Sequence, residues 1–176
     1  MSTRISRRTL LKAGVAGGAA LLLARWLYTS TTGPQSAPTR PGALGVPARS
    51  VVNAIAPVML AGALPANDQK LLQEVVAGVE QAIAGLPPAV RKEVDQLFAL
   101  LSFAPTRALI AGVWSPWPQA SPTSIRAFLD HWRDSRLALL RSAYGALHQL
   151  VFGAWYGNSH AWPTIGYAGP PSLEAG

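Results

Sequence analysis

The spacing of apolar residues between residues 68 and 156 constrains the fold of this chain most strongly. Apolar side chains recur there at intervals of three and four, which gathers them on one face of an α-helix. The first such stripe consists of Leu71, Leu72, Val75, Val76, Val79 and Ile83. No segment shows the two-residue alternation of a half-buried β-strand. The sequence therefore predicts an all-α fold, a small bundle of four to six helices.

Prolines, glycines and capping residues divide this region into separate helices. An early apolar segment, Val51–Ala63, is expected to kink or to restart at Pro57, because proline lacks the helical N–H. Asn67-Asp68 predicts the N-cap of the next helix, which Gly85 ends. Pro87-Pro88 opens a further helix, since proline is tolerated in a first turn. Its expected buried face is Val90, Val94, Leu97, Phe98 and Leu101.

The longest helical stretch runs from a cap near Ser121 to about Tyr156, and we expect a break near Asp134-Ser135. Its apolar seam alternates spacings of four and three, as in a coiled coil. The seam consists of Leu137, Leu140, Tyr144, Leu147, Val151 and Ala154. Gly145 and Gly153 lie within this stretch. Each destabilises a helix interior by about 1 kcal/mol relative to alanine. We expect them to mark close contacts with a neighbouring helix.

The first 28 residues carry a basic motif followed by an uncharged run, Ala13–Ala24. The motif resembles the twin-arginine export signal S/T-R-R-x-F-L-K, with leucine in the place of phenylalanine. Its residues are Ser6, Arg7, Arg8, Leu10, Leu11 and Lys12. The adjacent arginines, and Arg25 beyond the weakly apolar run, disfavour a Sec signal. We therefore expect the twin-arginine translocase to carry this chain, already folded, to the periplasm.

The apolar run is short for a membrane span. Residues 13–24 make about 18 Å of helix, whereas a bilayer core is about 30 Å thick. One alternative is that residues 1–28 remain as an uncleaved inner-membrane anchor, with Trp26 and Tyr28 at the interface. The other is removal of the leader, for which the best cleavage site is Val46-Pro47-Ala48.

Composition divides the rest of the chain. Residues 29–50 are rich in proline, glycine, serine and threonine, and they predict an extended linker without a regular element. The helical domain is expected over residues 51–171, and residues 172–176 are predicted to be a disordered tail.

The basic charge belongs to the leader and the linker. Of the 15 lysines and arginines, seven precede residue 51, and eight follow it together with all 8 acids. The part of the chain after residue 50 is therefore formally neutral, and the overall charge does not indicate nucleic-acid binding. The chain has no cysteine, which excludes disulfides, thiol catalysis and cysteine-ligated metals.

No residue pattern typical of catalysis or metal binding is found in the sequence. His131 and His148 lie about 25 Å apart on a straight helix, and we expect them and His160 at helix surfaces or partly buried. HExxH, a phosphate-binding glycine loop after a strand and a G-x-S-x-G elbow are absent. The sequence therefore predicts no catalytic, metal or cofactor site in this chain.

The C-terminal segment is aromatic and rich in proline and glycine. It consists of Trp155-Tyr156-Gly157-Asn158 and, after three residues, the run from Trp162 to Pro171. It resembles the tail of small subunits of membrane-bound flavin dehydrogenases, namely subunit 3 of gluconate 2-dehydrogenase and the small subunit of FAD-containing sorbitol dehydrogenase. In these families an aromatic helix end precedes a tryptophan and a Gly-Tyr-Pro-Gly-Pro stretch, where this chain has Ala168 after Tyr167.

This resemblance implies a non-catalytic accessory subunit. Its partner would be an FAD-dependent sugar, alcohol or acid dehydrogenase, often completed by a cytochrome c, and FAD would lie in the partner. The accessory subunit would help the partner to mature and to be exported. Two other functions stay open, a stand-alone membrane-tethered periplasmic protein with a binding or structural role, and an enzyme.

Aromatic side chains are the expected contacts with such a partner, since they are enriched at interface hot spots. The candidates are Trp155, Tyr156, Trp162, Ile165, Tyr167, Pro170, Trp114 and Trp117. The alternative is that these side chains cover the core of their own chain, where large aromatic residues bury much area.

Overall fold

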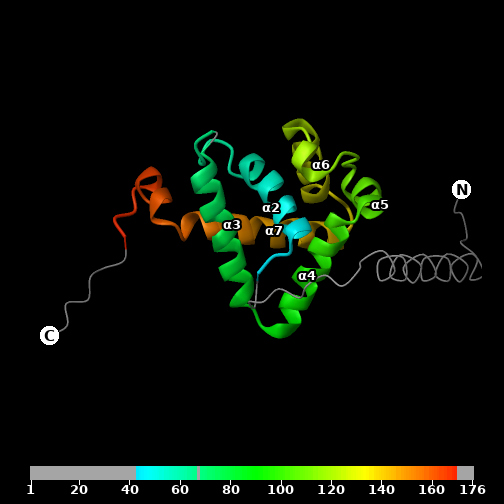
Figure 1. Cartoon of the computed structure of the whole chain (residues 1–176), viewed down its shortest axis with the longest axis horizontal. Coiled ribbons are helices and arrows are strands. Elements are labelled where there is room, and N and C mark those ends of the chain that lie inside the picture. The colour runs from blue at the N-terminus through cyan, green and yellow to red at the C-terminus, as the bar shows by residue number, and fades with distance from the viewer. Residues whose placement is uncertain (1–42, 67, 170–176) are drawn as a thin grey trace, which may run out of the picture. The chain divides into compact units, whose positions relative to one another are not determined.

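The computed structural model describes residues 43–66 and 68–169, and in this part of the chain the fold is all-α, without a β-strand (Figure 1). Its six α-helices are α2 (Val46–Met59), α3 (Gln69–Ala84), α4 (Pro88–Ser102), α5 (Ala104–Thr106), α6 (Pro122–Arg133) and α7 (Ala138–Tyr156). A single π-turn, η1 (Arg107–Ala111), follows α5, and η2 (Trp117–Gln119) is a 3₁₀ turn. The predicted fold class is confirmed. The export motif, the apolar run, Pro170 and the predicted tail lie outside the described residues.

The helical domain begins earlier than the sequence predicts. α2 starts at Val46, so the linker predicted over residues 29–50 is wrong at its C-terminal end. Leu44 is already buried, and its backbone N–H donates to Glu80 Oε1 at 3.1 Å. Arg49 forms an ion pair with the same carboxylate. Pro47 caused the error, because proline in a first turn begins a helix as readily as it marks a linker.

The position of Leu44 also bears on the cleavage site considered above. A cut after Ala48 would remove Leu44 from the core and would take away the first turn of α2. Burial of a leucine side chain is worth about 1.5–3 kcal/mol. The structure therefore disfavours Val46-Pro47-Ala48 as a site at which the leader is removed.

Helix boundaries predicted from capping residues are confirmed. Asp68 is the N-cap of α3, where its side chain accepts a hydrogen bond from the Leu71 N–H at 3.0 Å. Gly85 ends α3, and α4 begins at Pro88. The expected break in the long C-terminal stretch separates α6 from α7 at residues 134–137. Pro57 does not start a new helix, since α2 continues through it to Met59.

α2 is the central helix of the bundle, and it contacts α3, α4, α6 and α7. Its buried residues are Val51, Val52, Ile55 and Ala56. An aromatic corner closes the α6 side, where Phe128 meets Trp117 and Trp132 edge-on at centroid distances of 5.8 and 4.7 Å. The Trp117 Nε1–H donates to the Leu101 carbonyl at 2.8 Å, so this indole is satisfied inside the core.

α3 and α7 approach each other closely at Gly78. A Cβ atom on Gly78 would lie 2.9 Å from the Cβ of Ala154, which only glycine avoids. The prediction that Gly145 and Gly153 mark close contacts is wrong, because a Cβ atom at either position would meet nothing within 4 Å. The sequence signal pointed to the correct helix, but the close approach depends on the glycine of its partner.

Two of the predicted apolar faces include residues that the structure leaves exposed. On α4, Val94, Phe98 and Leu101 are buried, but Val90 in the first turn is exposed. On α7 the seam is buried at Leu147 and Val151, whereas Leu137 lies in the exposed connection before the helix. In both cases the periodicity continues past the point at which a neighbouring helix covers it.

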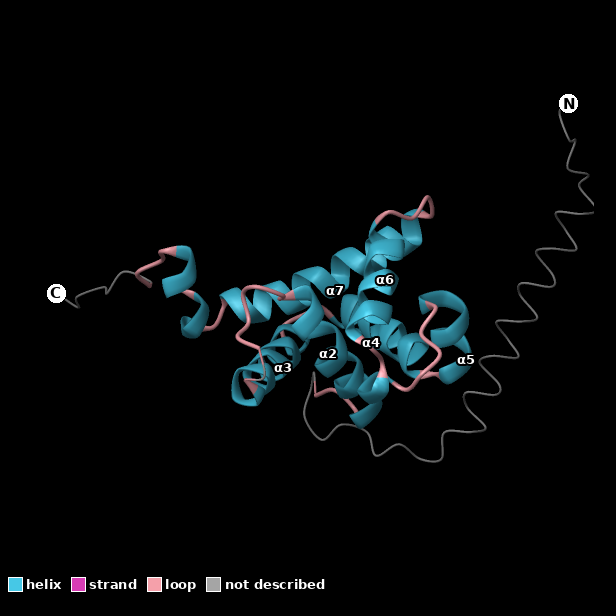
Figure 2. Cartoon of the chain, turned by 90° about the horizontal axis from the view of Figure 1, so that it is seen from above, coloured by secondary structure: helices cyan, strands magenta, loops and turns pink. Residues whose placement is uncertain are grey.

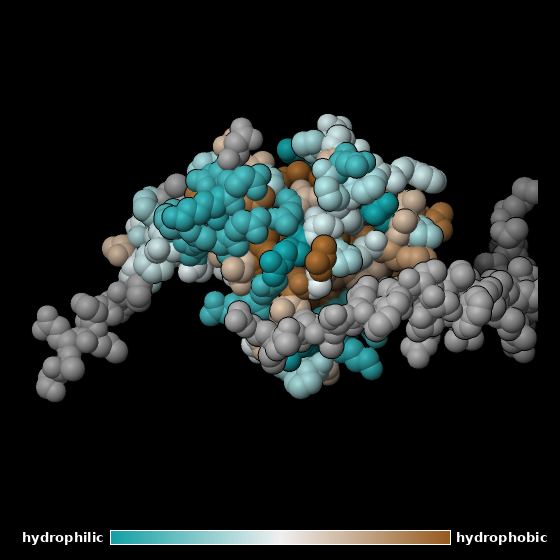
Figure 3. All heavy atoms as spheres, viewed as in Figure 1, coloured by the Kyte–Doolittle hydropathy of each residue, from teal (hydrophilic) through white to brown (hydrophobic). Residues whose placement is uncertain are grey.

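The two ends of the domain differ in shape and polarity. The segment after α7 projects beyond α3, while α5 lies at the other end of the domain, as both views show (Figures 1 and 2). Hydrophilic side chains dominate the α3 side in the space-filling view, whereas apolar side chains gather at the edge next to α5 (Figure 3).

Candidate functional site

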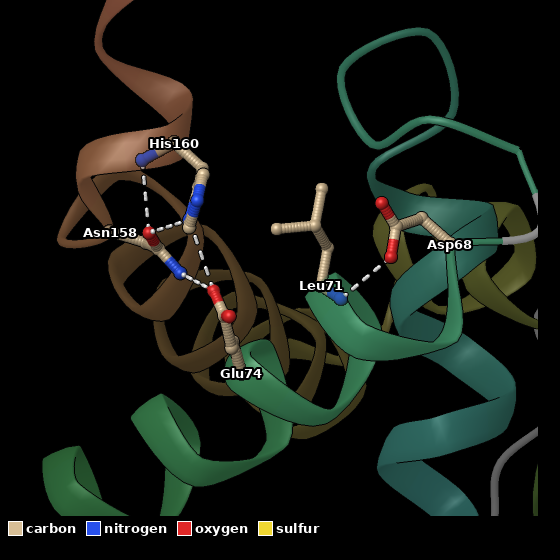
Figure 4. A network of polar contacts seen from close by, with 5 residues as sticks. All are labelled: Asp68, Leu71, Glu74, Asn158 and His160. Atoms are coloured by element: carbon tan, nitrogen blue, oxygen red, sulfur yellow. Dashed lines mark hydrogen bonds and ion pairs between the residues drawn. The ribbon is translucent and has the colours of Figure 1, made fainter.

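The segment that follows α7 is fixed to α3 by a small polar network (Figure 4). Two 3₁₀ turns make up this segment, η3 (Ser159–Ala161) and η4 (Pro163–Ile165). Asn158 Nδ2 donates to Glu74 Oε2 at 2.7 Å, and Asn158 Oδ1 accepts the backbone N–H of His160 at 3.0 Å. His160 Nδ1 lies 3.1 Å from the same Glu74 oxygen. Asn158 thus caps η3 and attaches it to α3 at once.

The network also lowers the pKa of Glu74. The Asn158 amide, which donates to the carboxylate, holds the pKa of Glu74 below its ordinary value, and partial burial opposes this effect. His160 and Lys70 act in the same direction as Asn158 through their charge. The lowered pKa favours the carboxylate form of Glu74, which accepts the hydrogen bond from Asn158.

Trp162 organises the remainder of the segment. Its Nε1–H donates to the Tyr156 carbonyl at 3.1 Å, and its own carbonyl accepts the Tyr167 N–H at 3.0 Å. The Tyr167 ring meets the indole edge-on at 5.4 Å. Gly166 and Gly169 have φ values of +68° and +99°, and a Cβ atom on Gly169 would lie 3.1 Å from the indole. The chain can fold around Trp162 only because glycine adopts these conformations.

The outer side of this folded segment remains exposed and apolar. Ile165 is 52% exposed and Tyr167 48%, and Tyr156 at the end of α7 is exposed as well. We name Tyr156, Trp162, Ile165 and Tyr167 the C-terminal aromatic surface. An aromatic column on α7 leads to it, with successive centroid distances of 5.9, 4.1 and 6.0 Å. The column consists of Tyr144, His148, Phe152 and Tyr156.

A groove of about 620 Å³ lies beside this surface, between α3 and α7. Small residues dominate its lining, namely Ala77, Gly78, Ala82, Gly153, Ala154 and Gly157. The polar residues of the lining are Glu74, Gln81, Asn158 and Ser159. Because its walls carry such short side chains, another polypeptide could approach the backbones of both helices here.

Two of the predicted contact residues belong to the core instead. Trp155 and Trp117 are 1% and 3% exposed, so neither can touch another protein. Successive residues of a helix differ by 100° in direction, which turns Trp155 inward and the adjacent Tyr156 outward. Trp114 is 80% exposed and is free to make contacts. The sequence pattern therefore located the aromatic segments without separating their inner from their outer members.

The three histidines occupy the kinds of position that the sequence predicts. His131 and His160 are exposed, and His148 is half-buried and stacks on Phe152. Within residues 43–66 and 68–169, no group of three His, Asp or Glu side chains is arranged to hold a metal ion.

The comparisons with other proteins leave the family of this chain open. No family model, curated protein or solved structure matches it. In the described part of the chain, no single helix is long and apolar enough to cross a membrane. The helical segments Pro88–Ser102 and Ala104–Ala111 are together long and apolar enough, by length and composition only, but the chain bends by 81° between them.

The residues that hold the candidate site together are not among those that the sequence predicts. Asn158 carries a readable signal, since asparagine is a preferred cap residue and it directly precedes η3. Its bond to Glu74 joins residues 84 apart in the chain, and no local pattern predicts that pairing. Arg107, a buried charged side chain whose Nε–H donates to the Val113 carbonyl at 3.1 Å, was also missed.

Proposed function

We propose that this chain is the accessory small subunit of a periplasmic FAD-dependent dehydrogenase, which it binds, helps to mature and carries through the twin-arginine route. The observation that carries the proposal is the C-terminal aromatic surface. Its sequence resembles the tail of such subunits, and its side chains are exposed on a segment that the fold holds in place.

The geometry of this surface suits protein binding. Tyrosine and tryptophan supply large contact areas at interface hot spots. A segment that is already ordered loses little conformational entropy on binding, and here Asn158 and Trp162 supply the order. The groove between α3 and α7 extends the contact area, because its small side chains admit a partner's backbone.

The leader supplies the second half of the proposal. A twin-arginine signal exports a folded protein, and a flavin enzyme acquires its FAD in the cytoplasm during folding. A dehydrogenase that lacks such a signal could therefore be exported while bound to a subunit that carries one. FAD then belongs to the partner, which a cytochrome c could complete on the periplasmic side of the inner membrane.

The leader is tested by replacing both motif arginines, Arg7→Lys and Arg8→Lys, in cells that also express the proteins encoded beside this chain. We expect the flavin dehydrogenase to stay in the cytoplasm, because the translocase recognises the arginine pair and not its charge alone. The measurement is dehydrogenase activity in separated periplasmic and cytoplasmic fractions. Arg25→Lys, the same change outside the motif, is the matched control and should leave export intact.

Unchanged export of the dehydrogenase by the double variant would contradict the escort role. Loss of this chain alone from the periplasm, with the dehydrogenase still exported, would favour a stand-alone membrane-tethered helical protein.

A further inference from the structure

A second exposed apolar surface lies at the α5 end of the domain, away from the C-terminal aromatic surface (Figures 1 and 2). It is formed by Leu109 and Ile110 in η1 and by Trp114 in the connection to η2. Leu109 and Trp114 are 81% and 80% exposed, far more than apolar residues that pack against their own chain. We name Leu109, Ile110 and Trp114 the apolar loop.

The fold holds the apolar loop in position from its inner side. The guanidinium of Arg107 is buried, and its Nε–H donates to the Val113 carbonyl, while the Val113 N–H donates to the Arg107 carbonyl at 3.3 Å. On α6, the Nε1–H of Trp132 donates to the Ile110 carbonyl at 3.0 Å. These bonds tie down the backbone on both sides of the exposed side chains. The backbone of the loop is therefore held in place while its apolar side chains are exposed.

Gly112 allows the chain to turn directly after η1. It ends η1 with a φ of +68°, a left-handed conformation that favours glycine. The chain turns back there, so that Val113 is buried while Trp114, the next residue, points outward.

Few charged residues lie near the apolar loop in the sequence, and the nearest acid after it is Asp130 on α6, which pairs with Arg133. Residues 96–129 contain no aspartate or glutamate, and their two charged residues are Arg107 and Arg126. A shallow groove of about 330 Å³ adjoins the loop, and its lining likewise has no acid. The groove is lined by Leu109, Ile110, Ala111, Gly112, Ser124, Ala127, Phe128 and His131. A surface without acids can approach an anionic layer without repulsion between like charges.

We infer that the apolar loop inserts Leu109, Ile110 and Trp114 into the interfacial region of an anionic lipid bilayer. Tryptophan prefers that region, and aliphatic side chains beside it gain by leaving water. Leu109 and Trp114 are almost fully exposed, and they can enter a fluid layer without the complementary shape that a protein partner would need. Neither the apolar loop nor the lining of its adjoining groove carries an acid that anionic headgroups would repel, and Arg126 lies near by in the sequence. This inference goes beyond the proposed function, since it requires no dehydrogenase.

The sequence also supplies a reason for the loop to meet a membrane. The apolar run Ala13–Ala24 belongs to a membrane-directed leader, and residues 29–42 join it to the first described residue. Fourteen residues span at most about 50 Å when fully extended. A retained leader would therefore keep the domain close to the bilayer surface, where a weak insertion suffices.

The inference is tested with single-cysteine labels on the full chain, which has no cysteine of its own. Leu109→Cys carries an environment-sensitive fluorophore into the apolar loop. Leu139→Cys is the matched control, because Leu139 is also a leucine and is 79% exposed in the first turn of α7. Both labelled chains are mixed with vesicles of phosphatidylglycerol and phosphatidylcholine, and with vesicles of phosphatidylcholine alone.

We expect the label at residue 109 to shift its emission to the blue on the anionic vesicles and to be quenched by brominated acyl chains. The label at residue 139 should show the same emission with vesicles as it does in water without them. The inference is overturned if the label at 109 stays in water while the chain is bound, or if both labels enter the bilayer equally. It is also overturned if the label at 109 shifts its emission equally on vesicles of phosphatidylcholine alone. None of these outcomes decides whether a dehydrogenase is exported.

Discussion

Gly78 sets the distance between α3 and α7, the two helices that position the candidate site. An alanine at this position would bring its Cβ to 2.9 Å from Ala154, whereas an alanine at Gly145 would meet no atom within 4 Å. Gly145→Ala should raise the free energy of unfolding by about 0.5–1 kcal/mol, since alanine favours a helix interior. The free energy of unfolding of Gly78→Ala should be about 1–3 kcal/mol lower than that of Gly145→Ala, because overpacking against Ala154 opposes the gain in helix propensity.

Urea unfolding of the two variants and the parent chain measures this difference. Since both variants make the same chemical change in a helix interior, intrinsic helix propensity cancels between them. Equal stabilisation by the two alanines would mean that α3 and α7 do not approach closely at Gly78.

Single residues also show the limit of periodicity as a guide. Trp155 and Tyr156 are neighbours in the same aromatic run, yet one is core and the other surface. The pattern placed both at a helix end, but it did not show which face α3 and the rest of the bundle cover. The same reason explains Val90 and Leu137, which continue an apolar stripe beyond the helices that bury it.

At the scale of elements, the C-terminal segment depends on the charge of Glu74. Its pKa lies below the ordinary value of 4.5, chiefly because of the hydrogen bond from Asn158. A carboxyl with a depressed pKa stabilises the fold above the pKa of the unfolded chain, and this contribution is lost as the pH falls through the folded value. We therefore expect η3 to detach from α3 in acid, before the bundle unfolds.

The variant Asn158→Ala tests whether the Asn158 amide lowers the pKa of Glu74 and holds η3 on α3. The pKa of Glu74 should rise towards its ordinary value, and amide exchange in η3 should accelerate, as NMR titration and hydrogen exchange would measure. Asn53→Ala is a suitable control, because Asn53 accepts a hydrogen bond from Gln73 on α3 and does not touch Glu74. A Glu74 titration that is the same in the parent chain and in Asn158→Ala would contradict the role given to this amide.

Helix boundaries could be predicted from the sequence where nearby residues determine them. Asp68, Gly85 and Pro88 mark helix boundaries by capping and by proline chemistry, and the structure has those boundaries. The start of α2 was missed, because Leu44 and Arg49 are ordered by Glu80 on a different helix. Long-range pairings of this kind, like that of Glu74 with Asn158, leave no periodic trace in the sequence.

At the scale of the whole molecule, the described domain carries two exposed apolar surfaces at opposite ends. The C-terminal aromatic surface lies at one end and the apolar loop at the other, with α2 and its neighbours between them (Figure 1). In our account the first surface holds a flavin dehydrogenase and the second meets the bilayer. The all-α architecture was predictable from the spacing of apolar residues, whereas the placement of the two surfaces required the packing of the helices.

The most direct test of this account is co-purification of the full chain from periplasmic and membrane fractions. We expect a large, flavin-containing protein to accompany the parent chain, detected by its absorbance and by released FAD. Ile165→Glu should abolish this association, because it places a charge on the C-terminal aromatic surface. Leu139→Glu, an equally drastic change at another exposed residue, should retain the flavin protein. A colourless chain that purifies alone, or a flavin protein that Ile165→Glu retains, would contradict the account.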